Sequence, residues 1–152
     1  KDYTNILEIE VIVREMSDLV ASRLRKIHAQ TECIRLSIGY SDSHLIRGFS
    51  HQMKIPATAN TKQLTAYALQ LFYNHYEYFS VRTVAVSCSK LIYQTSIQLD
   101  LFSDPEKMVQ EEKLDYLCDK IRNRYGFKAL VHASSLLPGA TAISRSSKIG
   151  GH

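Results

Sequence analysis

The feature that most constrains the fold is a change in the spacing of apolar residues near position 30. Over residues 5–29, apolar side chains recur every three or four positions, which predicts an amphipathic helix. The residues of this stripe are Ile9, Val13, Met16, Val20, Leu24 and Ile27. Over residues 33–41 the spacing becomes two, which predicts a strand with one buried face. The apolar residues of that strand are Ile34, Leu36, Ile38 and Tyr40.

Similar patterns predict three more elements before residue 91. Turn residues at 41–43 lead into a second strand, residues 45–55, which Pro56 is expected to end. Asn60 or Thr61 can cap a helix over residues 62–74, and a third strand follows over residues 80–90. The predicted fold class is therefore α+β: a small antiparallel sheet with two helices on one face, of the split βαβ type. The plan lacks only a leading strand, which we expect before Lys1 in a longer protein.

The chain changes character after residue 92. Residues 93–103 are predicted to be a linker, and Asp104 followed by Pro105 is typical of the start of a helix. That helix is predicted to run to about Tyr125, where Gly126 can end it. Residues 136–152 are rich in Ser and Gly and are expected to be poorly ordered. The predicted organisation is a domain over residues 1–92, a linker over 93–103 and a helical C-terminal tail over 104–152.

Composition and missing motifs exclude several classes of function. The net charge of +4 is compatible with a polyanionic partner. No apolar run approaches the roughly 20 residues that a membrane span needs. Cys33, Cys88 and Cys118 are widely spaced, which indicates reduced thiols in the cytoplasm and neither disulfides nor a zinc site. A phosphate-binding Gly-rich loop, a nucleophile elbow and a metal-binding His pair are all missing from the sequence, so no catalytic or metal site is predicted.

Two groups of side chains have both a functional and a structural interpretation. Asp115 and Asp119 share one face of the predicted helix and could bind a cation, but the neighbouring lysines favour a solvated charged face. Four aromatic residues after the second helix could stack on bases, but we favour packing at the edge of the domain. These residues are Tyr73, Tyr76, Tyr78 and Phe79.

A five-residue motif lies in the predicted linker. The peptide Gln98-Leu99-Asp100-Leu101-Phe102 resembles the Gln-Leu-x-Leu-Phe motif of proteins that bind the bacterial sliding clamp. The alternative is a buried linker or edge strand, since Leu and Phe near the end of a domain usually pack. The position between a polar connector and a capped helix favours an extended, exposed peptide. By the resemblance, the clamp-binding residues are Gln98, Leu99, Leu101 and Phe102.

The domain before this motif also has a family resemblance. Three of its segments resemble the little-finger domain of Y-family translesion DNA polymerases: Val20-Ala21-Ser22-Arg23-Leu24-Arg25, Ile38-Gly39-Tyr40-Ser41-Asp42 and Val81-Arg82-Thr83-Val84-Ala85-Val86-Ser87. Gly48-Phe49-Ser50 and the ending at residues 146–152 are similar to the UmuC/MucB/SamB-like branch of Gram-positive bacteria. The resemblance covers nearly the whole chain.

The resemblance implies an error-prone polymerase that acts in DNA damage repair and the SOS response in the cytoplasm. The intact protein would use Mg²⁺ ions held by palm carboxylates located before Lys1. This chain would have no cofactor and no polymerase activity of its own. Its partners would be primer–template duplex DNA and the sliding clamp, with no membrane involved.

The resemblance and the alternation of the strands together predict the DNA contacts. A little finger grips DNA through the open face of its sheet, where contacts to phosphates position the duplex without reading its sequence. The predicted contact residues are Arg35, Ser37, Arg47, His51, Arg82, Thr83 and Ser87. The alternative is a stand-alone nucleic-acid-binding module with an RRM-like βαββαβ plan, which needs aromatic side chains on its strands. Tyr40 and Phe49 are the candidates for that role.

Overall fold

A computed structural model describes residues 1–41, 45–93 and 104–148 of the chain. The main elements, in chain order, are α1 (Ile6–Lys26), β1 (Gln30–Tyr40), β2 (Gly48–Thr58), α2 (Thr61–His75), β3 (Val81–Ile92) and α3 (Pro105–Tyr125). Three short helical turns follow, η1 (Phe127–Ala129), η2 (Ala133–Leu136) and α4 (Ala142–Arg145). The clamp-like motif at residues 98–102 lies outside the described residues.

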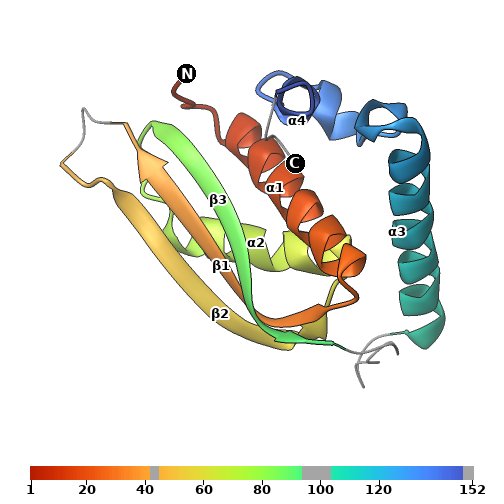
Figure 1. The fold of residues 1–152 in the computed structure, drawn as a ribbon. Helices are drawn as coiled ribbons and strands as arrows, with labels where there is room; N and C mark the ends of the chain where they lie inside the picture. Colours follow the sequence, from red (N-terminus) through yellow and green to blue (C-terminus); the bar gives the residue numbers. More distant parts are fainter. Residues whose placement is uncertain (42–44, 94–103, 149–152) are drawn as a thin grey trace.

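The three strands form one antiparallel sheet in the order β2-β1-β3. Helices α1 and α2 lie on the same side of this sheet, and α3 lies beyond α1 (Figure 1). Before α1, Tyr3 pairs with Val81 through two backbone hydrogen bonds of 2.8 Å, which ties the first residues to β3. The predicted α+β class, with two helices on one face and a C-terminal helix, is confirmed.

Apolar side chains from α1, α2 and β1 meet between the sheet and the two helices. On β1, Ile34, Leu36 and Ile38 are at most 2% exposed, which confirms the predicted alternation. Phe72 of α2 is fully buried against them in the same cluster. Burial of one such side chain contributes about 1.5–3 kcal/mol, so this cluster is the main source of stability. Asn60 begins α2 as predicted, accepting a hydrogen bond of 2.9 Å from the backbone N–H of Gln63.

Helix α1 is buried on a second side that its main apolar stripe does not predict. Val11 and Ile12 are each 7% exposed, and they share a helix face with Glu15 and Asp18. The residues after α3 cover this face: Glu15 contacts Thr141 and its neighbour through hydrogen bonds. The helix therefore lies between the sheet layer and the C-terminal segment.

The prediction that the second strand ends at Pro56 is wrong: β2 continues to Thr58. The register pairs Thr31 with Thr58 but Cys33 with Lys54, so an irregularity falls at the proline. Since β2 is also an edge strand, the missing N–H of Pro56 breaks no ladder of hydrogen bonds on its outer side.

The expectation of poor order is wrong for residues 136–148. Two backbone N–H groups, of Thr141 and Ala142, donate hydrogen bonds of 2.9 Å to Glu15, and Ala142 is buried. Gly139 has φ +90° and lies so close to Glu8 that an added Cβ would be 2.5 Å from the Cβ of that residue. The small residues of this segment allow close packing on α1. Composition alone suggested disorder, because Ser and Gly are also frequent in disordered segments.

Candidate nucleic-acid interface

The face of the sheet opposite α1 and α2 is not covered by any described helix (Figure 1). The strand register places nine residues on it in three rows across β2, β1 and β3. The rows are Gln52–Arg35–Ser87, Ser50–Ser37–Ala85 and Gly48–Gly39–Thr83. We call these nine residues the open face. The structure thus brings together four of the predicted contact residues, Arg35, Ser37, Thr83 and Ser87.

Side chains on the open face are oriented by hydrogen bonds across the strands. The Arg35 guanidinium donates to Oε1 of Gln52 from Nη2 at 2.6 Å and from Nε at 3.2 Å. The Ser37 and Ser50 hydroxyls are 2.8 Å apart and also hydrogen-bonded. The two bonds to Gln52 use two of the five N–H donors of Arg35, so the guanidinium can still donate to a bound phosphate.

One end of the open face requires glycine at two positions. A Cβ on Gly39 would lie 2.2 Å from Oγ1 of Thr83, across the strand pair. Gly48 has φ +140°, and a Cβ there would lie 2.0 Å from the carbonyl oxygen of Ile38. No larger residue fits these two positions without a shift of its neighbours, because the Thr83 side chain and the β1 backbone already occupy the space.

The charge of the open face is positive. Arg35 is the charged residue among the nine, and Lys54, two positions beyond Gln52 on β2, continues the same face and is exposed. The remaining side chains are small or are hydroxyl and amide groups. Such a surface suits contact with a polyanionic backbone and offers few groups that could distinguish one base from another.

His51 was predicted as a DNA contact, but it does not lie on the open face. His51 pairs with Leu36, which faces the helices, and residues that pair across strands point to the same side of the sheet. Its ring stacks on His75 at the end of α2, with the two centroids 3.7 Å apart. The alternation of β2 places Phe49, His51 and Met53 on the helix side, so the charge of His51 was the misleading signal.

Two other predicted contact residues lie at the ends of the strands. Arg82 falls where the β1–β3 register shifts, and its Nε is 3.1 Å from Oδ1 of Asp2. The hydrogen bond from Arg82 lowers the pKa of Asp2, which also accepts a hydrogen bond of 2.8 Å from Ser41. Arg47 is exposed in the connection between β1 and β2, where its carbonyl oxygen accepts a hydrogen bond from Tyr40. Both arginines are next to the open face and outside its three rows.

Three residues of the interface were missed by sequence reasoning. Ser50, Gln52 and Lys54 lie on the same side of β2 as the open face. A signal for them was present, because these polar residues alternate with Phe49 and Met53. The sequence-based choice weighed positive charge above the two-residue period.

The aromatic platform of an RRM-like module is not present on the described open face. Tyr40 is 4% exposed and accepts a hydrogen bond of 3.1 Å from the backbone N–H of Glu77. Its burial raises the pKa of its hydroxyl. Phe49 lies edge-on to Tyr40 on the helix side. Tyr76 and Phe79 pack into the same cluster as favoured, whereas Tyr73 and Tyr78 are exposed.

The prediction that Asp115 and Asp119 form a solvated face is wrong. Both carboxylates bind the guanidinium of Arg25 on α1: Nε lies 2.6 Å from Oδ2 of Asp119, and Nη1 lies 3.3 Å from Oδ2 of Asp115. The three side chains are 14–17% exposed. Burial raises the pKa of Asp115 above its usual value, although the charge of Arg25 opposes this. The sequence correctly predicted that Asp115 and Asp119 share one face of the helix. It did not reveal that Arg25 of α1 lies against that face.

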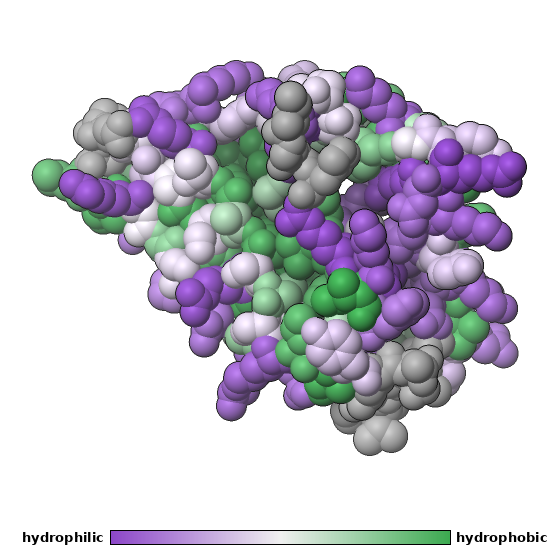
Figure 2. Space-filling view, in the orientation of Figure 1, coloured by the Kyte–Doolittle hydropathy of each residue, from purple (hydrophilic) through white to green (hydrophobic). Residues whose placement is uncertain are grey.

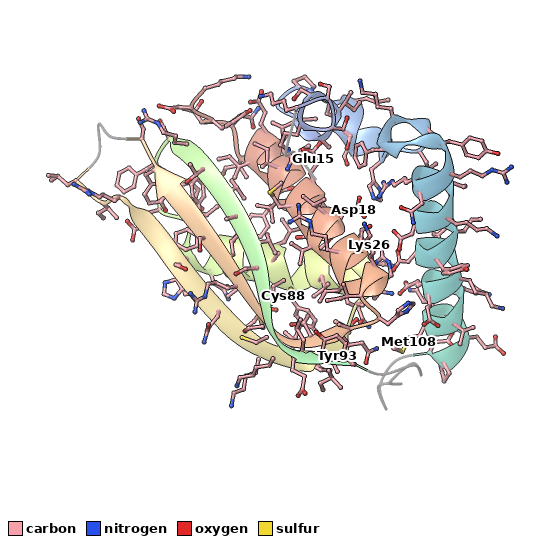
Figure 3. The ribbon with its side chains drawn as sticks, in the orientation of Figure 1. Glu15, Asp18, Lys26, Cys88, Tyr93 and Met108 are labelled. Atoms are coloured by element: carbon pink, nitrogen blue, oxygen red, sulfur yellow. The ribbon has the colours of Figure 1, made fainter. Side chains whose placement is uncertain are left out.

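A second ion-pair cluster joins α1 to α3 and to the segment after it. Asp18 lies 2.9 Å from Nη1 of Arg122 and 3.4 Å from Nε2 of His132. Figure 3 shows Asp18 and Glu15 on α1, on the side of the C-terminal elements. Burial alone would raise the pKa of Asp18, but the hydrogen bond from His132 and the charge of Arg122 lower it. The same hydrogen bond raises the pKa of His132.

The described part of the chain has neither a cluster of metal-binding side chains nor a helix suited to span a membrane. Residues 1–41, 45–93 and 104–148 contain no group of three or more His, Cys, Asp or Glu side chains placed to hold a metal ion. None of the described helices has the length and apolar composition to cross a membrane.

Comparison with known proteins agrees with this geometry. Residues 1–101 match the model of the impB/mucB/samB family C-terminal domain. Over its whole length the chain is 36% identical to a putative UV-damage repair protein, UvrX, of Bacillus subtilis, and covers 36% of that protein. It is 32% identical to DNA polymerase IV 2 of the same organism, again over its whole length and 37% of the relative.

A more distant organism provides a similar match. The DNA polymerase IV of Moorella thermoacetica is 32% identical over 92% of the chain and 34% of the relative. The chain therefore spans about a third of the length of these curated relatives. Because residues 1–101 match the model of its C-terminal domain, the chain belongs to the impB/mucB/samB family.

Proposed function

We propose that this chain is the DNA-gripping and recruitment part of a translesion DNA polymerase that acts in DNA damage repair. The observation that carries the proposal is the open face, a helix-free, positively charged sheet surface with small side chains. The family membership and the names of the relatives, DNA polymerase IV and a UV-damage repair protein, support it.

The open face would hold duplex DNA by its phosphates. Arg35 and Lys54 supply charge, and the hydroxyls of Ser37, Ser50 and Thr83 supply neutral donors. Because these groups contact phosphates, we expect binding that is independent of sequence and weakens steeply with salt. Sequence independence suits a polymerase that must accept any template.

The replacement of Arg35 and Lys54 by Ala together tests this role. Each lost phosphate contact lowers the slope of log affinity against log salt by about 0.9, so the double variant should lose about 2. Fluorescence anisotropy with a labelled duplex over a series of salt concentrations measures the slope. The control is the pair Lys107→Ala and Lys113→Ala, which removes two exposed charges from α3. An unchanged slope in the sheet variant would exclude the open face as the phosphate-binding surface.

Recruitment to the sliding clamp is proposed from the motif at residues 98–102. Leu101 and Phe102 would fill an apolar pocket of the clamp, while Gln98 anchors through its amide and Leu99 packs beside them. A few such anchors usually provide most of the binding energy. The double variant Leu101→Ala, Phe102→Ala should therefore abolish binding to purified clamp.

A matched control uses an exposed leucine and an exposed aromatic residue on α3. Tyr116 is 68% exposed and Leu117 is 51% exposed, and their joint replacement by Ala should leave clamp affinity unchanged. Equal affinity of the Leu101/Phe102 variant and the unmodified chain would contradict the proposed docking motif.

We propose that nucleotide addition is carried out by other parts of a longer protein. Its Mg²⁺-binding carboxylates would lie outside this chain, which would supply DNA grip and recruitment in the cytoplasm. Incubation of the purified chain with primer–template, nucleotides and Mg²⁺ should give no extension product. Extension by the purified chain would contradict this division of roles.

A further inference from the structure

A deep cleft lies between α1 and α3, away from the open face. Its volume is about 1050 Å³, and it is bordered by α1, α2, α3 and the C-terminal segment. In Figure 2 the surface over α3 is mainly hydrophilic, while hydrophobic residues are seen in the middle of the molecule, over the region of β3 and α1. The cleft is larger than the space that one ordered water or ion would need.

The lining of the cleft has an apolar part built from three helices. Leu19 of α1, Leu69 of α2 and Leu114 of α3 all line it. Leu114 is 59% exposed, and Leu19 and Leu69 are half-buried. Phe127, just after α3, adds an aromatic ring. Exposed apolar groups that gather in one concave place indicate a binding surface more often than single exposed leucines do.

The acidic groups that line the cleft all have a partner. Within the described residues, Asp18 pairs with Arg122 at 2.9 Å and Glu15 with Arg145 at 3.5 Å. Likewise, Glu111 pairs with Lys62 at 3.2 Å and Asp115 with Arg25 at 3.3 Å. Their charges are therefore largely neutralised.

Cationic side chains of α1 outnumber the acidic partners that are available to them in the cleft. Arg23 and Lys26 are exposed, line the cleft and form no ion pair among residues 1–41, 45–93 and 104–148. Arg14 has a single weak contact, 4.0 Å from Glu10. Lys26 is seen at the end of α1 nearest α3 in Figure 3. Since Leu19, Arg23 and Lys26 are spaced by four and three residues, they form one stripe of α1.

We propose that this cleft binds an acidic amphipathic helix of a partner protein. Leucine-type side chains of that helix would lie among Leu19, Leu69 and Leu114, and its Asp or Glu residues would face Arg23 and Lys26. The stripe from Leu19 to Lys26 is about 10 Å long, which matches about two turns of a bound helix. The cleft lies on the other side of α1 from the sheet, so DNA on the open face would leave it accessible.

A nucleic acid is the less suitable occupant of the cleft. The phosphates of a nucleic acid could pair with Arg23 and Lys26, but its sugar–phosphate backbone would leave the three leucines uncovered. Binding of single strands generally depends on aromatic side chains on which bases stack, and Phe127 is the aromatic residue that lines the cleft. The apolar lining therefore favours a peptide.

The test uses the full chain and two synthetic helical peptides of about 14 residues. The first has Leu at helical positions i, i+4 and i+7 with Glu beside them, and the second replaces each Glu by Lys. Fluorescence anisotropy should show binding of the Glu peptide and at least about tenfold weaker binding of the Lys peptide.

Three variants locate the binding surface. The double variant Arg23→Glu, Lys26→Glu should weaken the Glu peptide by about tenfold and strengthen the Lys peptide. Leu114→Ser should weaken both peptides, and its side chain is exposed enough that the fold should be kept. Lys113→Glu with Lys120→Glu, exposed residues of α3 that do not line the cleft, is the charge-matched control and should change neither affinity. Thermal unfolding of each variant verifies that the fold is intact.

Three outcomes would overturn the proposal. The first is failure of the Glu peptide to bind at any soluble concentration. The second is equal binding to the unmodified chain and to the Arg23/Lys26 variant. The third is displacement of the peptide by a single-stranded oligonucleotide that itself loses affinity for that variant, which would assign the cleft to nucleic acid.

Discussion

The sheet domain and the C-terminal helix α3 are held in place by different forces. The domain has an apolar cluster whose members on β1 and α2, such as Ile34 and Phe72, are fully buried. In contrast, α3 has no buried residue over its 21 positions. It is attached to α1 through Arg25 and through the ion pair of Asp18 with Arg122. The segment after it is attached to α1 through Asp18 and Glu15.

This difference teaches that the two regions respond to different perturbations. Apolar burial is insensitive to salt and to pH, whereas ion pairs depend on both. A change in the core should therefore unfold the whole domain. A change in the ion pairs should release α3 and the segment after it while the sheet stays folded.

The largest effect should come from the core. Phe72→Ala removes a fully buried ring between the sheet and the helices, which should lower the free energy of unfolding by about 3–5 kcal/mol. Urea denaturation followed by circular dichroism measures this. The neighbouring Tyr73 is 57% exposed, so Tyr73→Ala should cost about 0.5 kcal/mol or less. Equal effects of the two variants would contradict the placement of the core.

The next effect should come from Arg25. Arg25→Ala leaves two partly buried carboxylates, Asp115 and Asp119, without their cation, at a cost of about 3 kcal/mol. Amide hydrogen exchange should become faster in α3 and much less so in β1. Arg23→Ala removes an exposed arginine two positions away and should change neither region. Exchange that accelerates equally in α3 and β1 would mean that the two regions unfold as one unit.

A smaller effect is expected where the C-terminal segment crosses α1. Gly139→Ala requires an unfavourable backbone conformation and places a Cβ against Glu8, so the segment should be destabilised by about 1–3 kcal/mol. Faster exchange of the Ala142 amide, with unchanged exchange in the sheet, is the expected result. By comparison, Gly126 has a similar positive φ of +91° but open space around its Cβ position, so Gly126→Ala should cost less than Gly139→Ala. A greater cost at Gly126 would contradict the described contact with Glu8.

The smallest effect should be a pH dependence of the same attachment. Asp18 raises the pKa of His132 in the folded chain, so the protonated imidazole stabilises the contact fully below the unfolded pKa of about 6.5. That contribution is lost as the pH rises through the higher folded pKa. Exchange of the amides after α3 should therefore be slower near pH 6 than near pH 8, after correction for intrinsic exchange. In His132→Ala this difference should disappear, and its persistence would assign the pH dependence to another group.

Sequence patterns predicted the domain well because its elements are fixed by burial. The periods of three to four and of two give α1, α2 and the strands, and Asp104 and Gly126 fix the ends of α3. The contacts of α3 could not be predicted, since a charged helix face looks the same whether it meets water or Arg25. Within the sheet, the choice of His51 failed because it relied on charge and not on the two-residue period of β2, which places His51 on the helix side.

The central claim, that DNA binds the open face while α3 serves other contacts, is tested most directly by NMR. Titration of the labelled chain with a short duplex should shift the amide resonances of Ser37, Ser50 and Ser87, and shift those of α3 little. The Arg35→Ala, Lys54→Ala variant should show smaller shifts at the same DNA concentration. Shifts centred on α3 or on the cleft beside it, with the open-face resonances unchanged, would contradict the account.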